Sequence, residues 1–212
     1  GSEMCIRDRN MESKFHELKN RLLKNIDQTS ESRLYMDIQL AQNCETLMSI
    51  IKKDIGYLAK EGILSPSIAE DFKDVFLSAG IKCNSGGSSG YMLIWDGTAV
   101  DISGTATAVI WKSERAFIKG RACAFLLGEV SAITCERSMV IAAGSSTILA
   151  EGDSVVGVSG YHASVKASGY ATVVNMNCPN IDLRDNTRLW LPARGSFAAR
   201  KNCDIIVKDK EE

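Results

Sequence analysis

The chain has 212 residues, of which 45% are hydrophobic, and its formal net charge at pH 7 is −1. This size allows a sizeable core in one or two domains, and the near-neutral charge argues against nucleic acid or an anionic membrane as a direct partner. Because we find no run of eighteen apolar residues and no secretion signal, we expect no membrane span and a cytoplasmic location.

Residues 1–10 are expected to be a remnant of cloning and sequencing and to lie outside the fold. Gly1 and Ser2 are typical of a cleaved tag. The stretch from Met4 to Arg9 looks like a translated transposase sequencing adapter, a known contaminant at the ends of metagenomic contigs. The natural start would then be Met11 or a residue upstream of it.

Residues 11–83 are predicted to form a helical domain. The first helix covers Met11 to Ile26, and the second starts near Thr29 or Ser30, which suit an N-cap, and ends at Gly62. Apolar residues of the second helix follow each other by threes and fours over about 30 residues, which is the spacing of a coiled-coil seam. The sequence therefore predicts one long, coiled-coil-like helix here.

A third helix is predicted to begin at Ser65 and Pro66, a favoured pair for the N-cap and the first helical position, and to end at Gly80 as its C′ residue. The stretch that follows, residues 84–90, has the sequence NSGGSSG. Because glycine and serine dominate it, we expect a flexible linker between the helices and the rest of the chain.

Residues 91–208 carry an eight-residue period. Every eighth residue from Val109 to Ile205 is large and apolar except Gly157, the positions two residues away are mostly small, and glycines separate the octads. Alternation within an octad indicates a strand, and one such repeat buries its apolar side only by stacking on others. The sequence predicts an α+β chain with a parallel β-solenoid of two strands per coil; an antiparallel sandwich of short strands is the alternative. Residues 209–212 would be a charged tail.

The repeated large residues are expected to face the interior of the solenoid, in a register without insertions. The residues next to them then face outward, and one outward side is too apolar to remain in water. It would be covered by the helical segment of the same chain, by a second copy, with a dimer favoured, or by a foreign partner. The predicted interface residues on this side are Ile110, Leu126, Val140, Val156 and Val158, and those at the C-terminal end, which would meet a target, are Arg188, Trp190 and Arg194.

The seven cysteines are odd in number and show no CxxC spacing, which argues against a disulfide framework and against a zinc site. Cys123, Cys135 and Cys203 fall at positions expected to face the interior, where a small thiol packs like alanine. This use of cysteine favours a reducing cytoplasm.

The sequence shows no catalytic constellation. The GxSxG, HExxH, Walker, Rossmann and EF-hand patterns are missing, and the two histidines stand apart, His16 on a helix and His162 at an octad corner near Tyr161 and Tyr170. The acidic residues of the octads lie at different corners without a matched pair, so a carbohydrate-active enzyme is disfavoured. They are Glu114, Glu129, Glu136, Glu151, Asp153, Asp182 and Asp185. We expect a protein that is not an enzyme and uses no metal or cofactor.

The octad His162–Gly169 shows the repeat Ala-x-Val-x-Ala in full, and the segment Tyr170–Asn175 shows its first part, Ala-x-Val. They resemble β-solenoid proteins with small-residue octads that phages and mobile elements of gut bacteria encode. The resemblance covers residues 91 to about 208, implies the fold, and brings no catalytic residue with it.

From these observations we hypothesise a non-enzymatic protein-binding factor in the cytoplasm of a bacterial host. Its class would be a phage-derived, anti-CRISPR-like inhibitor, and its partner a host defence protein such as a CRISPR nuclease. One alternative is a self-assembling structural solenoid protein. Another is a sponge for a small ligand or nucleotide, with a pocket near Tyr161 and His162.

Overall fold

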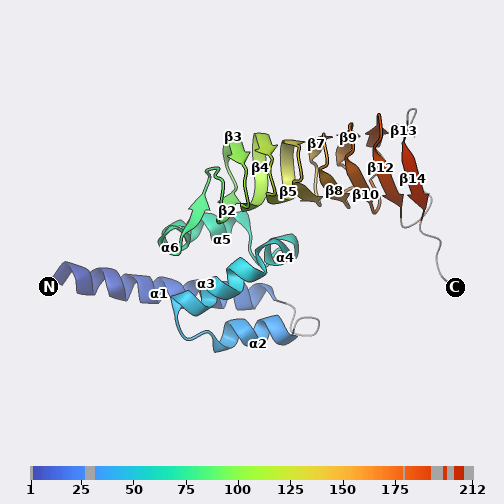
Figure 1. Ribbon diagram of the computed structural model, residues 1–212. Helices are drawn as coiled ribbons and strands as arrows, with labels where there is room; N and C mark the ends of the chain where they lie inside the picture. Colours follow the sequence, from blue (N-terminus) through green and yellow to red (C-terminus); the bar gives the residue numbers. More distant parts are fainter. Residues whose placement is uncertain (1, 27–31, 179, 192–197, 200–202, 208–212) are drawn as a thin grey trace. The chain divides into compact units, whose positions relative to one another are not determined.

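The structure is a computed structural model that describes residues 2–26, 32–178, 180–191, 198–199 and 203–207 (Figure 1). The chain divides into two compact units, residues 1–83 and residues 84–212. The first unit is mainly helical and the second is built of strands.

The helical unit contains six described helices and one short strand. Its buried side chains come from every helix and include Leu18, Ile38, Leu47, Leu58 and Phe76, each with no exposed surface. The elements are α1 (Ser2–Asn25), α2 (Ser32–Leu40), α3 (Cys44–Lys53), α4 (Ile55–Lys60), α5 (Pro66–Asp71), α6 (Lys73–Ser78) and β1 (Ile81–Cys83).

The prediction of one long second helix is wrong, because the segment forms α2, α3 and α4 with breaks between them. At the first break the side chain of Asn43 accepts a hydrogen bond from the Thr46 amide at 2.9 Å and so starts α3. The freed carbonyl of Ala41 accepts a hydrogen bond from Lys19 Nζ at 2.7 Å. The apolar spacing continues across the break, so the pattern alone did not reveal it. The predicted caps Thr29 and Ser30 lie outside the described residues.

The predicted helix boundaries around Ser65 and Gly80 are confirmed. Ser65 Oγ accepts a hydrogen bond from the Ile68 amide at 3.3 Å, and Pro66 occupies the first position of α5. Gly80 has a φ of 76°, the left-handed conformation that ends a helix. The third helix differs from the prediction in one respect, since α5 and α6 are separate elements that meet at Phe72.

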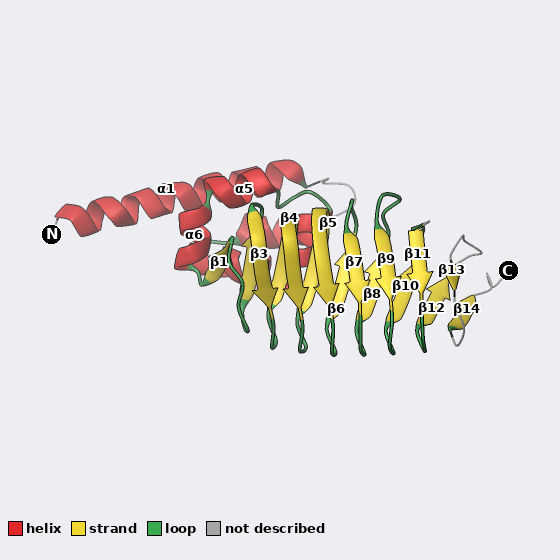
Figure 2. Cartoon of the chain, turned by 90° about the horizontal axis from the view of Figure 1, so that it is seen from above, coloured by secondary structure: helices red, strands yellow, loops and turns green. Residues whose placement is uncertain are grey.

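The second unit is a parallel β-solenoid, as the octads predicted, and it has about six turns. Each coil contributes one strand to each of two sheets, and Figure 2 shows the coils following one another along the solenoid. The strands are β2 (Tyr91–Ile94), β3 (Gly97–Ile102), β4 (Thr107–Ile118), β5 (Cys123–Thr134), β6 (Met139–Ala142), β7 (Thr147–Ala150), β8 (Val155–Val158), β9 (Ser164–Ala167), β10 (Thr172–Asn175), β11 (Asn180–Leu183), β12 (Arg188–Leu191), β13 (Ala198–Ala199) and β14 (Asp204–Val207).

Two sheets run the length of the solenoid. We call the first sheet the one formed by β2, the N-terminal parts of β4 and β5, and then β6, β8, β10, β12 and β14. The second sheet consists of β3, the C-terminal parts of β4 and β5, and then β7, β9, β11 and β13. Strands β4 and β5 are long because each bends from one sheet into the other.

The assignment of the octad residues to the interior is wrong for the first half of the solenoid. Ala124 and Leu126 are fully buried, whereas the octad residue Phe125 between them lies on the outside and is half-buried. From β9 to β12 the octad residues Val165, Val173, Ile181 and Leu189 do face inward and are buried. The interior is largely apolar and forms one continuous core, to which polar side chains such as Thr134, Ser138 and Asn175 are also buried neighbours.

The cause of this change is an inserted residue. Neighbouring coils pair residues 16 apart, as in Met139 with Val155, but Thr147 pairs with Ser164 and Val155 with Thr172, which are 17 apart. The extra residue lies in the connection 159–163 between β8 and β9, so the predicted register without insertions is wrong. A shift of one residue exchanges the inward and outward sides of a strand.

The segment 84–90 is part of the solenoid, so the prediction of a flexible linker is wrong. Asn84 Oδ1 accepts hydrogen bonds from the amides of Trp95 at 2.8 Å and Asp96 at 3.1 Å. The Gly87 amide donates to the carbonyl of Asp101 at 2.8 Å. Position 86 requires glycine, because a Cβ on Gly86 would meet the Asp101 carbonyl oxygen at 2.2 Å. The segment forms the first corner of the stack.

Candidate interaction surface

The outward side of the first sheet is the most apolar exposed surface of the solenoid. Since successive side chains of a strand alternate, the residues between the buried ones point outward and form columns across the coils. We call these residues the apolar face. Its central column is Phe125, Ile141, Gly157, Val174, Trp190 and Ile206, and its border column is Cys123, Met139, Val155, Thr172, Arg188 and Asp204.

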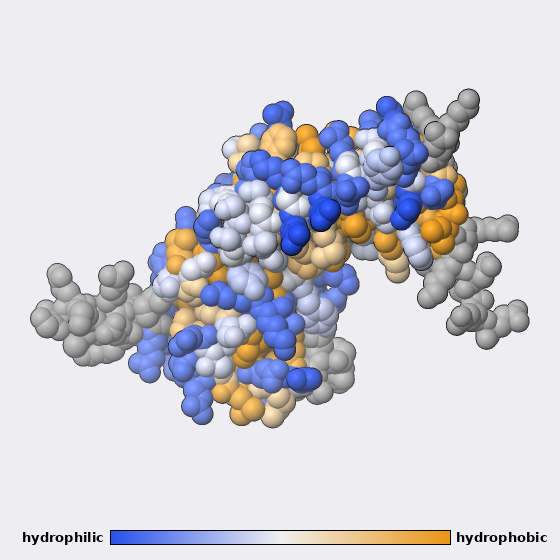
Figure 3. Space-filling view, viewed as in Figure 1, coloured by the Kyte–Doolittle hydropathy of each residue, from blue (hydrophilic) through white to orange (hydrophobic). Residues whose placement is uncertain are grey.

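Several large side chains of the apolar face are well exposed. The exposed fraction is 44% for Met139, 38% for Val155 and 44% for Trp190. Met176, which directly follows β10 beside this face, is 58% exposed. Figure 3 shows hydrophobic residues along the border of the solenoid where Figure 1 labels β8 and β10, and around the C-terminal coils. A contiguous apolar surface on a folded domain is typical of a binding site.

The outward side of the second sheet is more polar. Its columns contain the charged residues Asp101, Arg115, Lys166 and Asp182, with the polar Ser131 and Thr147 and the apolar Phe117, Ile133 and Leu149 between them. On the apolar face, the two described columns carry no charge from β5 to β10, and Arg188 and Asp204 follow in the border column. The Nε of Arg188 lies 3.9 Å from a carboxylate oxygen of Asp204, and both side chains are largely exposed. The two sheets therefore offer different surfaces to a partner.

Five of the eight predicted interface residues lie in the core, so their assignment to an outer surface is wrong. They are at most 1% exposed and belong to the continuous interior, because the alternation has the opposite phase in these strands. These residues are Ile110, Leu126, Val140, Val156 and Val158. Arg188 and Trp190 are exposed on the apolar face, and Arg194 lies outside the described residues.

The acidic corner residues include two with a structural role that the sequence did not reveal. Glu136 and Asp185 each have a φ of 60°, at positions where other coils place glycine. A carboxylate oxygen of Glu136 accepts a hydrogen bond from the Gly120 amide at 2.8 Å, and one of Asp185 accepts from the Gly169 amide at 3.4 Å. Each side chain therefore binds the amide of the preceding coil.

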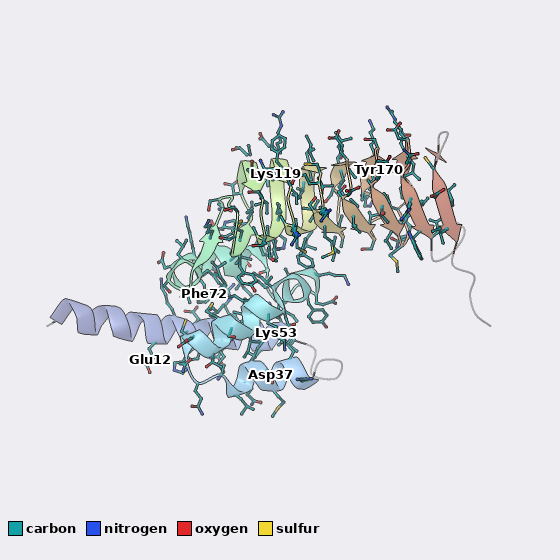
Figure 4. All side chains as sticks on the ribbon, in the orientation of Figure 1. Glu12, Asp37, Lys53, Phe72, Lys119 and Tyr170 are labelled. Carbon is teal, nitrogen blue, oxygen red and sulfur yellow. The ribbon has the colours of Figure 1, made fainter. Side chains whose placement is uncertain are left out.

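The same edge of the solenoid carries a charged contact between coils. Lys119 Nζ lies 2.9 Å from a carboxylate oxygen of Asp101, and this hydrogen bond raises the pKa of Lys119. Figure 4 shows Lys119 and Tyr170 along this border. All of these groups are exposed, and none lies with others in a described pocket. We find no arrangement here that activates a nucleophile or a proton donor.

The small-ligand pocket expected near Tyr161 and His162 stays a prediction, and Tyr170, their neighbour in the sequence, lies apart from them. Tyr161 and His162 lie in the connection from β8 to β9, and Tyr170 lies in the connection from β9 to β10. Because β9 runs between these connections, they occupy opposite edges of the solenoid. Tyr161 and Tyr170 are 68% and 66% exposed. His16 is exposed on α1, where its ring lies 4.9 Å from that of Phe15.

The cysteines differ partly from their predicted positions. Cys123 is on the apolar face and Cys135 is at a corner, so their assignment to the interior is wrong, whereas Cys203 packs against the core. Burial raises the pKa of the Cys123 and Cys178 thiols, which lowers their reactivity. Within the described ranges, no three His, Cys, Asp or Glu side chains gather in a way that could hold a metal ion.

Comparison with known proteins found no matching family model, no matching curated protein and no matching solved structure. None of the helices in the described part of the chain combines the length and the apolar character that a membrane span requires.

Proposed function

We propose that the protein acts by binding another protein through the apolar face, without catalysing a reaction. The observation that carries this proposal is the position of Met139, Val155 and Trp190 on one flat sheet, each more than a third exposed. Such side chains contribute to stability when a partner removes them from water, at about 25 cal/mol per Å² of apolar area. Methionine and tryptophan are also typical of the centres of protein interfaces.

The solenoid provides a rigid support for this surface. Its backbone amides and carbonyls pair between coils, and the core beneath the face is continuous from β2 to β12. The backbone of such a sheet is already ordered before binding, which lowers the entropic cost of association. The hypothesis that the partner is a bacterial defence enzyme, inhibited by a phage-derived factor, rests on the octad resemblance and stays a prediction.

The test is an affinity capture from bacterial lysate with the tagged full chain and two matched variants, read by mass spectrometry. Val155→Asp changes the apolar face, and Thr147→Asp places the same charge on the second sheet; both residues are exposed. We expect a stoichiometric protein, either foreign or an untagged copy of this chain supplied with the lysate, that the wild type and Thr147→Asp retain and Val155→Asp loses. Equal retention by all three proteins would refute the apolar face as the binding surface.

A further inference from the structure

The central column of the apolar face contains one residue that the fold itself does not explain. Gly157 interrupts a column of large apolar residues in the middle of β8. Its φ is not positive, and a Cβ at this position would meet the Val140 carbonyl oxygen at 3.9 Å, which is an ordinary van der Waals contact. Glycine within a strand weakens it, and often marks a place where another molecule approaches closely.

By contrast, other glycines of the solenoid are required by the packing of the coils. A Cβ on Gly128 would lie 2.1 Å from the Trp111 carbonyl oxygen, and one on Gly160 would lie 2.5 Å from the Gly144 carbonyl oxygen. At Gly157 the missing side chain leaves a notch in the apolar face, between Ile141 and Val174. Packing within the single chain therefore does not require glycine at position 157, and we look for the reason in a contact with another molecule.

The same column contains a side chain of the size that fills such a notch. Trp190 is 44% exposed, and Val174 pairs with Gly157 on one side and with Trp190 on the other. Val174 thus lies midway between the notch and the tryptophan. A two-fold axis that lies parallel to the strands above Val174 would place Trp190 of each copy over Gly157 of the other copy. This mutual fit is the condition for a symmetric dimer interface.

We propose that the apolar face is occupied by a second copy of this chain, with Trp190 of each copy in the Gly157 notch of the other and the two Val174 side chains in contact at the axis. The proposal rests on the proposed protein-binding function and names the partner. It pairs β8 with β12 and β6 with β14 of the other copy, so five strands overlap. Arg188 and Asp204 then lie in the border column opposite Val155 and Met139 of the other copy, at the rim where long polar side chains extend toward water.

The size of the overlap indicates how stable this dimer is. Five strands about 4.8 Å apart and four residues of about 3.3 Å each give a flat area of about 24 by 13 Å per copy. With the relief of the side chains, two such faces remove on the order of 1,000 Å² from water, which is at the lower end of specific interfaces. We therefore expect a reversible dimer that dissociates on dilution.

The position of Val174 on the axis provides the test. Val174→Glu and Val174→Arg are each made in the full chain, and sedimentation velocity is measured for the wild type, each variant and their equimolar mixture. We expect a dimer for the wild type, monomers for each variant because like charges meet at the axis, and a heterodimer in the mixture. Circular dichroism establishes that each variant is folded, and the mixture tests the contact even where a single variant loses stability.

A second variant separates the notch from general surface effects. Gly157→Val fills the notch, and we expect it to keep or raise the melting temperature of the monomer while weakening the dimer at least about tenfold. A wild type that stays monomeric at about 200 µM, a mixture without heterodimer, or assembly that grows beyond two copies would overturn the proposal. If the wild type stays monomeric but a foreign protein is captured through the apolar face, the proposed protein-binding function remains. If the wild type stays monomeric and no foreign protein is captured, both the dimer and the protein-binding function are refuted.

Discussion

Three leucine-to-alanine substitutions test which side of each strand faces the core. Leu149 and Leu189 occupy equivalent places in the octad period, 40 residues apart, and Leu126 lies outside the series. In the structure Leu126 and Leu189 are fully buried, whereas Leu149 points outward from β7 and is partly exposed. An unbroken octad register would make Leu149 and Leu189 alike, but the inserted residue in 159–163 makes Leu189 resemble Leu126.

The expected magnitudes follow from burial. Removing a fully buried leucine side chain costs about 3 kcal/mol, since the transfer free energy is lost and a cavity remains. Leu149 loses contacts with its outward neighbours Ile133 and Lys166 in the adjacent coils, which are worth less than about 1 kcal/mol. For a chain of this length, 3 kcal/mol corresponds to a fall in melting temperature of about 6–12 °C.

The assay is thermal unfolding of the three variants and the wild type, followed by circular dichroism and calorimetry. We expect Leu126→Ala and Leu189→Ala to melt well below the wild type and Leu149→Ala to melt within about 4 °C of it. If the melting temperature of Leu149→Ala falls as much as that of Leu189→Ala, the inserted residue and the assignment of inward and outward sides are refuted. Exchange of amide hydrogens in β12 serves as the control for local opening of the last coils.

Three further predictions concern the corners and one buried thiol. In urea unfolding, Gly120→Ala should lower the stability by about 2–3 kcal/mol, because the φ of Gly120 is 74° and the new Cβ would lie 2.9 Å from the Gly104 amide nitrogen. Gly90→Ala should cost only about 1 kcal/mol, because Gly90 has a φ of 80° but open space around the new Cβ. Equal losses would contradict the packing argument. Glu136→Ala should be less stable than Glu136→Gly, because both lose the hydrogen bond to Gly120 but glycine relieves the left-handed backbone; the reverse order of melting temperatures would disprove this. Burial raises the pKa of Cys83 to about 11, although the charge of Lys73 partly lowers it. The folded chain therefore favours the protonated thiol. The stability that this thiol contributes should be complete below pH 9.0 and lost between pH 9.0 and about 11. Cys83→Ala should make this decline in the free energy of unfolding smaller. The same decline in Cys83→Ala and in the wild type would contradict the assignment to Cys83.

The period of the sequence predicted the solenoid, but not which side of each strand is buried. Both sides of the first sheet are apolar, so Leu126 and its neighbour Phe125 are equally plausible core residues by composition. The insertion was hidden because it falls in the corner sequence 159–163, where glycine and polar residues permit any length. Only the pairing of residues between coils shows which of the two alternating sides of a strand faces the core.

Some of the missing information is present in the sequence once the 16-residue coil is known. Left-handed corner residues recur at Gly104, Gly120, Glu136, Gly152, Gly169 and Asp185. The single step of 17, from Gly152 to Gly169, reveals the inserted residue, and the same series marks Glu136 and Asp185 as corner residues. Local signals were sufficient where one residue dictates the backbone, as at Ser65 and Gly80.

The candidate surface was predicted in kind but not in its residues. Trp190 and Arg188 were predicted because arginines gather with a tryptophan in the C-terminal coils, while the five aliphatic residues were assigned to the wrong side. The notch at Gly157 was visible as the exception in the octad series, but its meaning depends on two facts from the structure. Its outward position and the open space around its Cα separate it from the glycines that coil packing requires.

Methionine oxidation measures most directly whether another protein covers the apolar face. Met139 and Met176 lie on or beside the face and are 44% and 58% exposed, and Met36 on α2 is 48% exposed and provides a control of the same chemistry. The full chain is oxidised at about 1 µM and about 200 µM, and sulfoxide formation is measured by mass spectrometry. We expect Met139 and Met176 to become protected at the higher concentration while Met36 reacts equally at both. Unchanged oxidation of Met139 and Met176, alone and with any captured partner, would contradict the account.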